Sequence, residues 1–172
     1  MIPNTNLQHS LIGISGWSGS GKTTLIEKLI PILIDYGLRV NVVKDSHHNV
    51  ELEPPHKDSA RIRRAGAAEV LLTSPFRFVI THELRNEKEP PLKELLSRMQ
   101  SADITLVEGF RNEAIPHLEV YRPILGKQPM YLENPHIKAV ASDTPQPRNF
   151  PLNMIWLNLN DINQIAKWIL NQ

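Results

Sequence analysis

Residues Gly16 to Thr23 carry the strongest chemical signal of the sequence. They match G-x-x-x-x-G-K-[ST], a loop in which backbone N–H groups surround phosphate oxygens. We expect Lys22 to reach the β- and γ-phosphates of a nucleotide and the Thr23 hydroxyl to ligate Mg²⁺. A helix that begins near Lys22 would aim its positive end at the same anion. The residues predicted to contact the nucleotide are Gly16, Trp17, Ser18, Gly19, Ser20, Gly21, Lys22, Thr23 and Thr24.

An acidic residue that could complete this site follows a second apolar run. Glu108 ends the run Ile104 to Val107, the place where a nucleotide-phosphate fold holds Mg²⁺ directly or through water. Gly109 would let a backbone N–H approach the γ-phosphate. A solvated strand end is the alternative reading of Glu108. The sequence therefore predicts Thr23 and Glu108 as magnesium ligands, with Lys22 and Glu108 as catalytic groups.

Asp45 is a third catalytic candidate, because an acid at the end of the second predicted strand can face Mg²⁺ or a water aimed at the γ-phosphate. A plain turn residue is an equal alternative. His47 and His48 suggest a metal site, but neighbours on an extended segment point to opposite sides and chelate poorly. The remaining histidines are scattered along the chain: His9, His56, His82, His117 and His136.

The elements that must position these residues alternate between strands and helices. A short strand at 11–15 precedes the loop, and a helix with two apolar rows runs to Tyr36 before Gly37. The strand at 39–43 is then reached by a crossover, which makes it parallel to the first. We therefore predict an α/β fold with a mostly parallel central sheet flanked by helices. Further strands are predicted at 102–110, 118–122, 137–141 and 154–157, with a closing helix capped by Asn160 or Asp161.

The middle of the chain departs from this alternation. A short helix through Arg64, capped by Asp58 or Ser59, carries Arg61, Arg63 and Arg64, which could meet phosphate, acids of a partner or only solvent. Two strand-like runs follow at 69–73 and 76–81, separated by Ser74-Pro75, and they read as an inserted β-hairpin. Its exposed edge suggests pairing with a second chain. A helix begins near Pro91, with Leu92, Leu95, Leu96 and Met99 predicted to face inward.

Composition restricts the class of protein. The chain has 172 residues, a formal net charge of +1 and no cysteine, so it offers no disulfide, no thiolate metal site and no global field for nucleic acid or anionic membranes. No apolar run approaches the length of a membrane span. We expect a single nucleotide-binding domain over 1–172 with a hairpin excursion at about 69–81, acting in the cytoplasm without nucleic acid or membrane partners.

Five motifs follow one another along the chain: Gly16 to Thr24, Lys44-x-x-His47-His48, Lys57-Asp58-Ser59 with Arg63-x-Ala65-Gly66-Ala67, Leu106 to Phe110, and Ala139 to Asp143. In this order and spacing they resemble the molybdopterin-guanine dinucleotide biosynthesis adaptor family, MobB. The resemblance implies a P-loop NTPase that binds GTP and Mg²⁺, hydrolyses GTP weakly and forms a homodimer whose sheet crosses both subunits. It also implies that the protein assists the molybdenum cofactor guanylyltransferase, with molybdopterin as a further candidate ligand. One position departs from the family, because Asp45 replaces the first histidine of Lys-His-x-His-His.

Base selection is predicted at Asp143, which follows the strand 137–141 on the ligand side of the sheet. One carboxylate can accept from both N1–H and N2–H₂ of guanine, whereas adenine has an acceptor at N1. A role in shaping the turn before Pro145 is the alternative. Three other functions compete with the adaptor reading: a small-molecule kinase, a metal-insertion GTPase that uses His47 and His48, and a scaffold that binds nucleotide without turnover.

Overall fold

The computed structural model describes residues 10–46 and 48–172, so His9 and His47, which entered the metal hypothesis, lie outside the described residues. The described residues form two compact units, one within 10–45 and 99–172 and the other within 46–98. The expectation of a single domain with a hairpin excursion is not tested by this division into units and stays a prediction. None of the helices in the described ranges has the length and apolar composition that crossing a bilayer requires.

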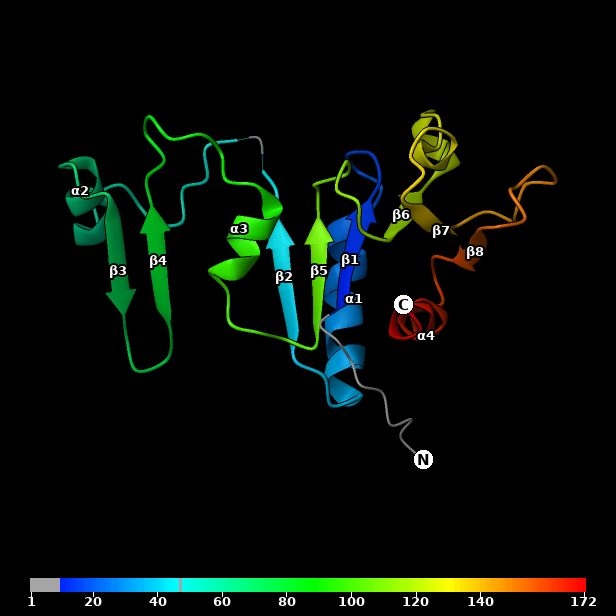
Figure 1. Cartoon of the computed structure of the whole chain (residues 1–172), viewed down its shortest axis with the longest axis horizontal. Coiled ribbons are helices and arrows are strands. Elements are labelled where there is room, and N and C mark those ends of the chain that lie inside the picture. The colour runs from blue at the N-terminus through cyan, green and yellow to red at the C-terminus, as the bar shows by residue number, and fades with distance from the viewer. Residues whose placement is uncertain (1–9, 47) are drawn as a thin grey trace. The chain divides into compact units, whose positions relative to one another are not determined.

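The first unit contains a six-stranded sheet in which every neighbouring pair of strands is parallel (Figure 1). The strand order is β2-β5-β1-β6-β7-β8, so the chain moves from β1 toward one edge and later from β6 toward the other. Carboxyl ends of strands beside such a reversal are where ligands bind in open α/β sheets. The strands are β1 (Ser10–Ser15), β2 (Val40–Lys44), β5 (Ile104–Glu108), β6 (His117–Tyr121), β7 (Ile137–Ser142) and β8 (Ile155–Asn158).

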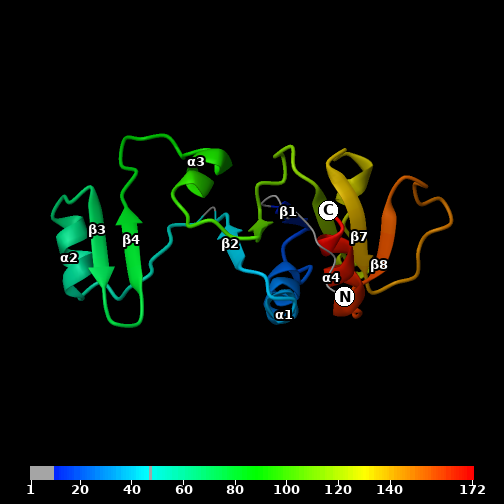
Figure 2. The same cartoon turned by 60° about the horizontal axis from the view of Figure 1, so that its bottom comes forward.

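Helices α1 (Lys22–Asp35) and α4 (Ile162–Leu170) pack against each other, as Figure 2 shows, and share one buried cluster with the sheet. Leu29 and Leu33 from α1 and Ile165 from α4 are fully buried in it. The Asp161 side chain accepts from the Gln164 N–H at 2.9 Å and caps α4, which confirms the prediction of its start.

The sheet also buries side chains on its opposite face. Along β7, Ala139 and Ala141 belong to the cluster under the helices, whereas Val140 packs with Phe150 in a second cluster. This alternation is the period of two of a β-strand buried on both sides. Two 3₁₀ turns, η1 (Pro123–Leu125) and η2 (Met130–Leu132), follow β6, and the sequence patterns did not predict them.

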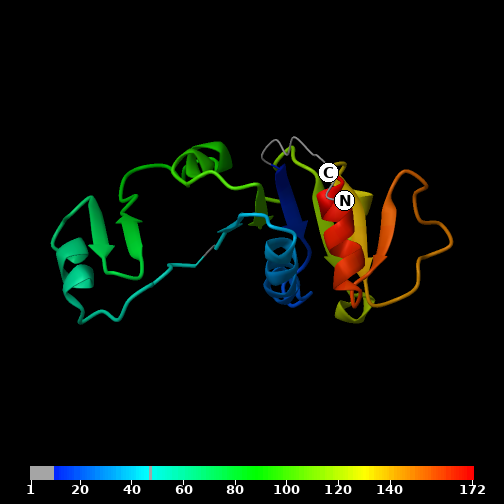
Figure 3. The same cartoon turned by 90° about the horizontal axis from the view of Figure 1, so that it is seen from below.

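The second unit contains α2 (Asp58–Arg64), a two-stranded antiparallel sheet of β3 (Glu69–Thr73) and β4 (Phe78–His82), and α3 (Leu92–Ser97). Helix α2 lies beside β3, as Figure 3 shows. The inserted hairpin is confirmed.

Three details of residues 57–99 differ from the prediction. The hairpin turn has four residues instead of two, because the Ser74 hydroxyl accepts from the N–H groups of Phe76 and Arg77 and keeps Phe76 out of β4. Lys57 occupies the N-cap position of α2 in extended conformation, so the predicted cap at Asp58 or Ser59 is wrong. Met99 lies beyond the end of α3 and is exposed, which corrects its predicted inward position.

Candidate functional site

The glycine-rich loop joins β1 directly to α1, as its sequence predicts. Gly16, Gly19 and Gly21 adopt φ angles of 141°, 80° and 99°, a region that side chains with a Cβ rarely enter. A Cβ on Gly16 would also lie 2.5 Å from the Val120 carbonyl oxygen, so the loop can pass β6 only with glycine there. The first N–H groups of the following helix have no intrahelical acceptor and can serve an anion.

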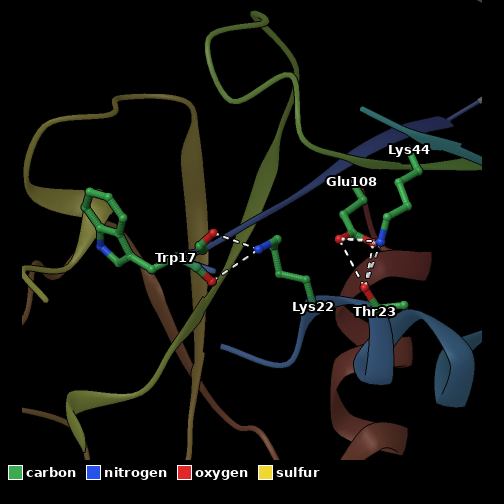
Figure 4. A network of polar contacts seen from close by, with 6 residues as sticks. Trp17, Lys22, Thr23, Lys44 and Glu108 are labelled. Atoms are coloured by element: carbon green, nitrogen blue, oxygen red, sulfur yellow. Dashed lines mark hydrogen bonds and ion pairs between the residues drawn. The ribbon is translucent and has the colours of Figure 1, made fainter. Parts of the chain in front are cut away.

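Lys22, the first residue of α1, turns back over the loop (Figure 4). Its Nζ donates to the Gly16 carbonyl at 2.9 Å and to the Trp17 carbonyl at 3.2 Å. Partial burial lowers the pKa of the Lys22 ammonium, the Glu108 carboxylate opposes that shift, and the Lys44 charge adds to it. The loop therefore holds one cation where the motif places the phosphates.

Thr23 and Glu108 meet although 85 positions separate them, because Glu108 ends β5 directly beside β1. The Thr23 Oγ1 lies 3.1 Å from both carboxylate oxygens of Glu108. Magnesium bonds of about 2.0–2.1 Å place neighbouring oxygen ligands of an octahedron about 3.0 Å apart. The hydroxyl and the carboxylate thus have the chemistry and the spacing that Mg²⁺ requires.

Lys44 is a third member of this group that sequence reasoning did not place in the site. It pairs in register with Glu108 across β2 and β5, and its Nζ lies 3.1 and 3.2 Å from the two carboxylate oxygens and 3.0 Å from Thr23 Oγ1. A usable signal was present, since Lys44 ends a strand predicted to emerge beside the phosphate loop. The site therefore combines two ammonium groups with one carboxylate.

Asp45 and Gly109 directly follow β2 and β5 and contact each other there. The Asp45 N–H donates to the Glu108 carbonyl at 2.8 Å, and Gly109 adopts a φ of 96°. A Cβ on Gly109 would lie 2.5 Å from the Asp45 Cβ, so glycine is required for this approach. The catalytic role of Asp45 and the phosphate contact of Gly109 stay predictions.

Arg122, which follows β6, connects the loop to the predicted base-reading residue. Its Nε donates to the Ser20 carbonyl at 2.9 Å, and its Nη1 lies 3.2 Å from Asp143 Oδ2. Asp143 directly follows β7, on the ligand side as predicted. Ser20 itself is buried and its N–H donates to Trp17, so its side of the loop is fixed by protein contacts. The sequence patterns did not identify Arg122.

The segment after Arg122 contacts the loop at Trp17. The Trp17 indole N–H donates to the Gln128 carbonyl at 2.8 Å, and the Lys127 ammonium lies 5.8 Å from the indole centroid. The fully buried Glu119 carboxylate anchors this segment by accepting from the N–H groups of Met130 and Tyr131 at 2.7 and 2.8 Å. Burial raises the pKa of Glu119, and the two N–H bonds oppose the shift.

The arginines considered for phosphate binding, and some of the histidines considered for a metal site, have other partners. No group of three or more histidine, aspartate or glutamate side chains with metal-binding geometry occurs within 10–46 and 48–172. His117 is fully buried and bonds Ser15. In the second unit Arg63 pairs with Glu83 at 2.8 Å and with Glu53 at 3.6 Å. Arg61 pairs with Asp58, and Arg64 donates to the Pro55 carbonyl.

A parallel sheet with a glycine-rich loop at its reversal point, followed by a helix that starts with Lys22-Thr23, defines the P-loop class of α/β proteins. Within that class, residues 11–143 match the family model described as "Molybdopterin guanine dinucleotide synthesis protein B", MobB, and the chain belongs to this family. The family and the fold imply nucleotide binding.

Two curated relatives carry the name molybdopterin-guanine dinucleotide biosynthesis adapter protein. The Escherichia coli protein is 38% identical over 163 residues, covering 93% of this chain and 91% of the relative. The Haemophilus influenzae protein is 40% identical over 168 residues, covering 96% and 90%. A crystal structure of molybdopterin-guanine biosynthesis protein B is similar with a TM-score of 0.71 and 28% identity, over 94% of this chain and 98% of that one. These findings confirm the resemblance inferred from the motifs.

Proposed function

We propose that the protein is a GTP-binding accessory factor that assists the formation of molybdopterin guanine dinucleotide and hydrolyses GTP weakly with Mg²⁺. The observation that carries the proposal is that Lys22, Thr23 and Glu108 come together at the end of the loop. Thr23 Oγ1 lies 3.1 Å from both carboxylate oxygens of Glu108. The adapter name of two relatives that are 38–40% identical supports the pathway. The proposed partner is the molybdenum cofactor guanylyltransferase, the further ligand is molybdopterin, and the proposed compartment is the cytoplasm.

Each residue of the site has a distinct task in this proposal. The loop N–H groups and the Lys22 ammonium would hold the β- and γ-phosphates, while Thr23 and Glu108 would hold Mg²⁺. Bound Mg²⁺ supplies charge neutralisation on the phosphoryl group during transfer. Asp45 is proposed to orient the attacking water, and Gly109 to offer a backbone N–H to the γ-phosphate. Hydrolysis is proposed to be slow.

Guanine selection is proposed for Asp143. Its carboxylate follows β7 and is held by Arg122, whose other nitrogen bonds the Ser20 carbonyl of the loop. A base reader fixed in this way keeps a defined position relative to the phosphates. Adenine has an acceptor at N1 that would face this carboxylate where guanine has a donor, so a preference of about tenfold for GTP over ATP is expected.

The hairpin is proposed to pair with a second copy of the chain. Leu71 and Ile80 lie directly opposite each other on one face, are 61% and 55% exposed, and are joined there by Phe78 at 64%. A two-stranded ribbon is marginally stable unless such a face packs, and exposed apolar clusters mark interaction sites. A homodimer through this ribbon is therefore the assembly that we propose.

The kinase and metal-insertion readings have no specific observation in their favour. The arginines that would hold a phosphoryl acceptor are engaged by Glu53, Glu83, Asp58 and the Pro55 carbonyl. Only His48 of the histidine pair is described, and it is exposed. Both readings stay as alternatives with distinct tests: nucleotide consumption that rises with an acceptor, and tight Ni²⁺ or Zn²⁺ binding lost in His47→Ala.

Calorimetric titration with GTP, ATP and molybdopterin, with and without Mg²⁺, tests the proposal. Lys22→Ala removes the charge over the loop and Thr23→Ala removes a magnesium ligand, so each should weaken Mg-GTP binding at least about tenfold, or 1.4 kcal/mol. Glu108→Gln should reduce phosphate release more than GTP affinity, because the loop contacts persist.

The matched control is Lys138→Ala, which removes an exposed strand lysine whose Nζ bonds only the Pro135 carbonyl among the described contacts. It should bind Mg-GTP like the parent. Equal affinity of Lys22→Ala and the parent would refute the assignment of the loop. Tight GTP binding without any phosphate release would favour the scaffold reading over the GTPase.

A further inference from the structure

Lys44 places an ammonium group at the position where the magnesium ligands meet. Its Nζ lies within 3.0–3.2 Å of all three oxygens of Thr23 Oγ1 and the Glu108 carboxylate, and Figure 4 shows these contacts. An ammonium carries three N–H donors and no acceptor, so three oxygens satisfy it completely. The residues that fit Mg²⁺ thus already surround a cation of the chain.

We propose that the Lys44 ammonium is a built-in counter-cation of the Thr23–Glu108 pair, and that Mg²⁺ and Lys44 compete for these two residues. The inference rests on the magnesium site of the proposed function. It assigns to Lys44 a positioning role that the phosphate-loop motif does not contain.

Mg²⁺ and the Lys44 ammonium would lie too close together to be bound at this position at the same time. A magnesium ion bonded to Thr23 Oγ1 at about 2.1 Å lies no farther than about 5.1 Å from a Lys44 Nζ that stays 3.0 Å from the same oxygen. Like charges at that separation repel strongly at the effective dielectric constant of a protein surface. One cation must therefore leave when the other binds.

The difference in burial between Lys44 and Glu108 indicates that Lys44 is the side chain that moves when Mg²⁺ binds. The Glu108 side chain is 10% exposed at the end of a strand buried along its length, whereas the Lys44 side chain is 53% exposed. Four methylene groups give the lysine many rotamers in which its charge reaches water. Lys44 can swing out at small cost, while Glu108 and Thr23 remain in place for the ion.

The exchange has a consequence for nucleotide binding without metal. A bare Glu108 carboxylate beside the loop would repel the polyphosphate, and the Lys44 charge cancels this repulsion. Loss of Lys44 should therefore weaken nucleotide binding in the absence of metal. It should also lower the Mg²⁺ concentration at which the enhancement of nucleotide binding by Mg²⁺ is half-maximal. A merely structural lysine would not produce these two opposite shifts.

The test measures binding of a fluorescent guanine nucleotide at increasing Mg²⁺, and Mn²⁺ binding directly by electron paramagnetic resonance. Lys44→Met should lower the half-saturating Mg²⁺ at least about fivefold, allowing for the exposure of the lysine, and tighten Mn²⁺ binding by a similar factor. Lys44→Gln serves as a second neutral variant, with circular dichroism to verify folding. Lys44→Arg keeps the charge and should retain a magnesium requirement closer to that of the parent.

Lys138→Met is the matched control, because Lys138 is also an exposed strand lysine of the same sheet, and it should behave like the parent. If the parent responds to Mg²⁺ and both neutral variants need the same or more of it, the inference is overturned while the proposed function stands. If Lys44→Arg behaves like Lys44→Met, charge competition is likewise overturned. A parent whose nucleotide affinity ignores Mg²⁺ would remove the magnesium site itself, and with it both proposals.

Discussion

Gly13→Ala probes the close approach between β1 and β6 that precedes the phosphate loop. A Cβ on Gly13 would lie less than 3.0 Å from three ring atoms of His117, which is paired with Gly13 in the sheet. The ring is fully buried and cannot turn away without breaking two hydrogen bonds. Its Nε2 lies 3.1 Å from the Glu113 carbonyl, which only accepts, so Nε2 donates and Nδ1 accepts from Ser15 Oγ at 2.9 Å.

The cost of Gly13→Ala follows from these contacts. Extra volume in a close-packed core costs about 1–3 kcal/mol, and a broken buried hydrogen bond adds about 1 kcal/mol. We expect a loss of about 3 kcal/mol in the free energy of unfolding. For a chain of this size that corresponds to a fall in Tm of roughly 6–12 °C.

Urea denaturation of four proteins tests this reasoning: the parent, Gly13→Ala, His117→Ala and the double variant. Once the ring is gone, Gly13→Ala should be neutral or stabilising by up to about 1 kcal/mol, since alanine costs less entropy than glycine in a strand. The two sites should therefore couple by at least about 2 kcal/mol. Additive losses in the double variant would show that the ring is not the obstacle and would refute the packing argument.

Three further predictions use separate features of the molecule. Burial lowers the pKa of His117, so below about pH 6.5 the unfolded chain binds a proton at this residue and the folded chain does not. The free energy of unfolding of the parent, relative to that of His117→Gln, should therefore fall as the pH is lowered from about 7.5 to 5.5. A difference that stays constant over this range would contradict the prediction. Leu71→Ser with Phe78→Ser should shift the sedimentation of the protein at micromolar concentration from dimer to monomer, and a parent that is already monomeric would contradict the hairpin interface. Asp143→Asn should erode the preference for GTP over ATP about tenfold in competition binding while Mg²⁺ enhancement persists; an unchanged preference would place base recognition elsewhere.

The parts of the site that the sequence predicted are those with a local signal. The glycine spacing specifies the loop, Lys22 and Thr23 follow it directly, and Glu108 ends an apolar run, so each can be read from its own neighbours. The start of α4 at Asp161 was predictable for the same reason, because an N-cap acts within one turn. The order of the strands needed the family resemblance or the structure.

Lys44 and Arg122 were not predicted as site residues because their partners depend on register. Lys44 meets Glu108 only when β2 pairs with β5 at that offset, and 64 positions separate the two residues. Arg122 reaches the Ser20 carbonyl only because β6 lies beside β1. Adjacent strands and their offset are tertiary properties, which propensity and periodicity do not contain.

The errors in the second unit have a different cause. Phe76 has the apolar character of a strand residue, yet the Ser74 hydroxyl holds the turn around it and leaves the phenyl ring 90% exposed. The Ser59 hydroxyl, expected at the N-cap, donates instead to the Glu53 carboxylate. In both places the hydrogen bonding of one serine hydroxyl outweighed a preference that averages over many proteins.

The second unit, residues 46–98, is the chain's route from β2 to its sheet neighbour β5. The cost of closing a connection between two strands grows only with the logarithm of its length, so the sheet tolerates an entire unit there as readily as a short crossover. Lys44 and Glu108 would keep their register whatever the connection contains. Evolution can therefore remodel the hairpin without moving Lys44 or Glu108, and the same junction is where an engineer could exchange one inserted unit for another.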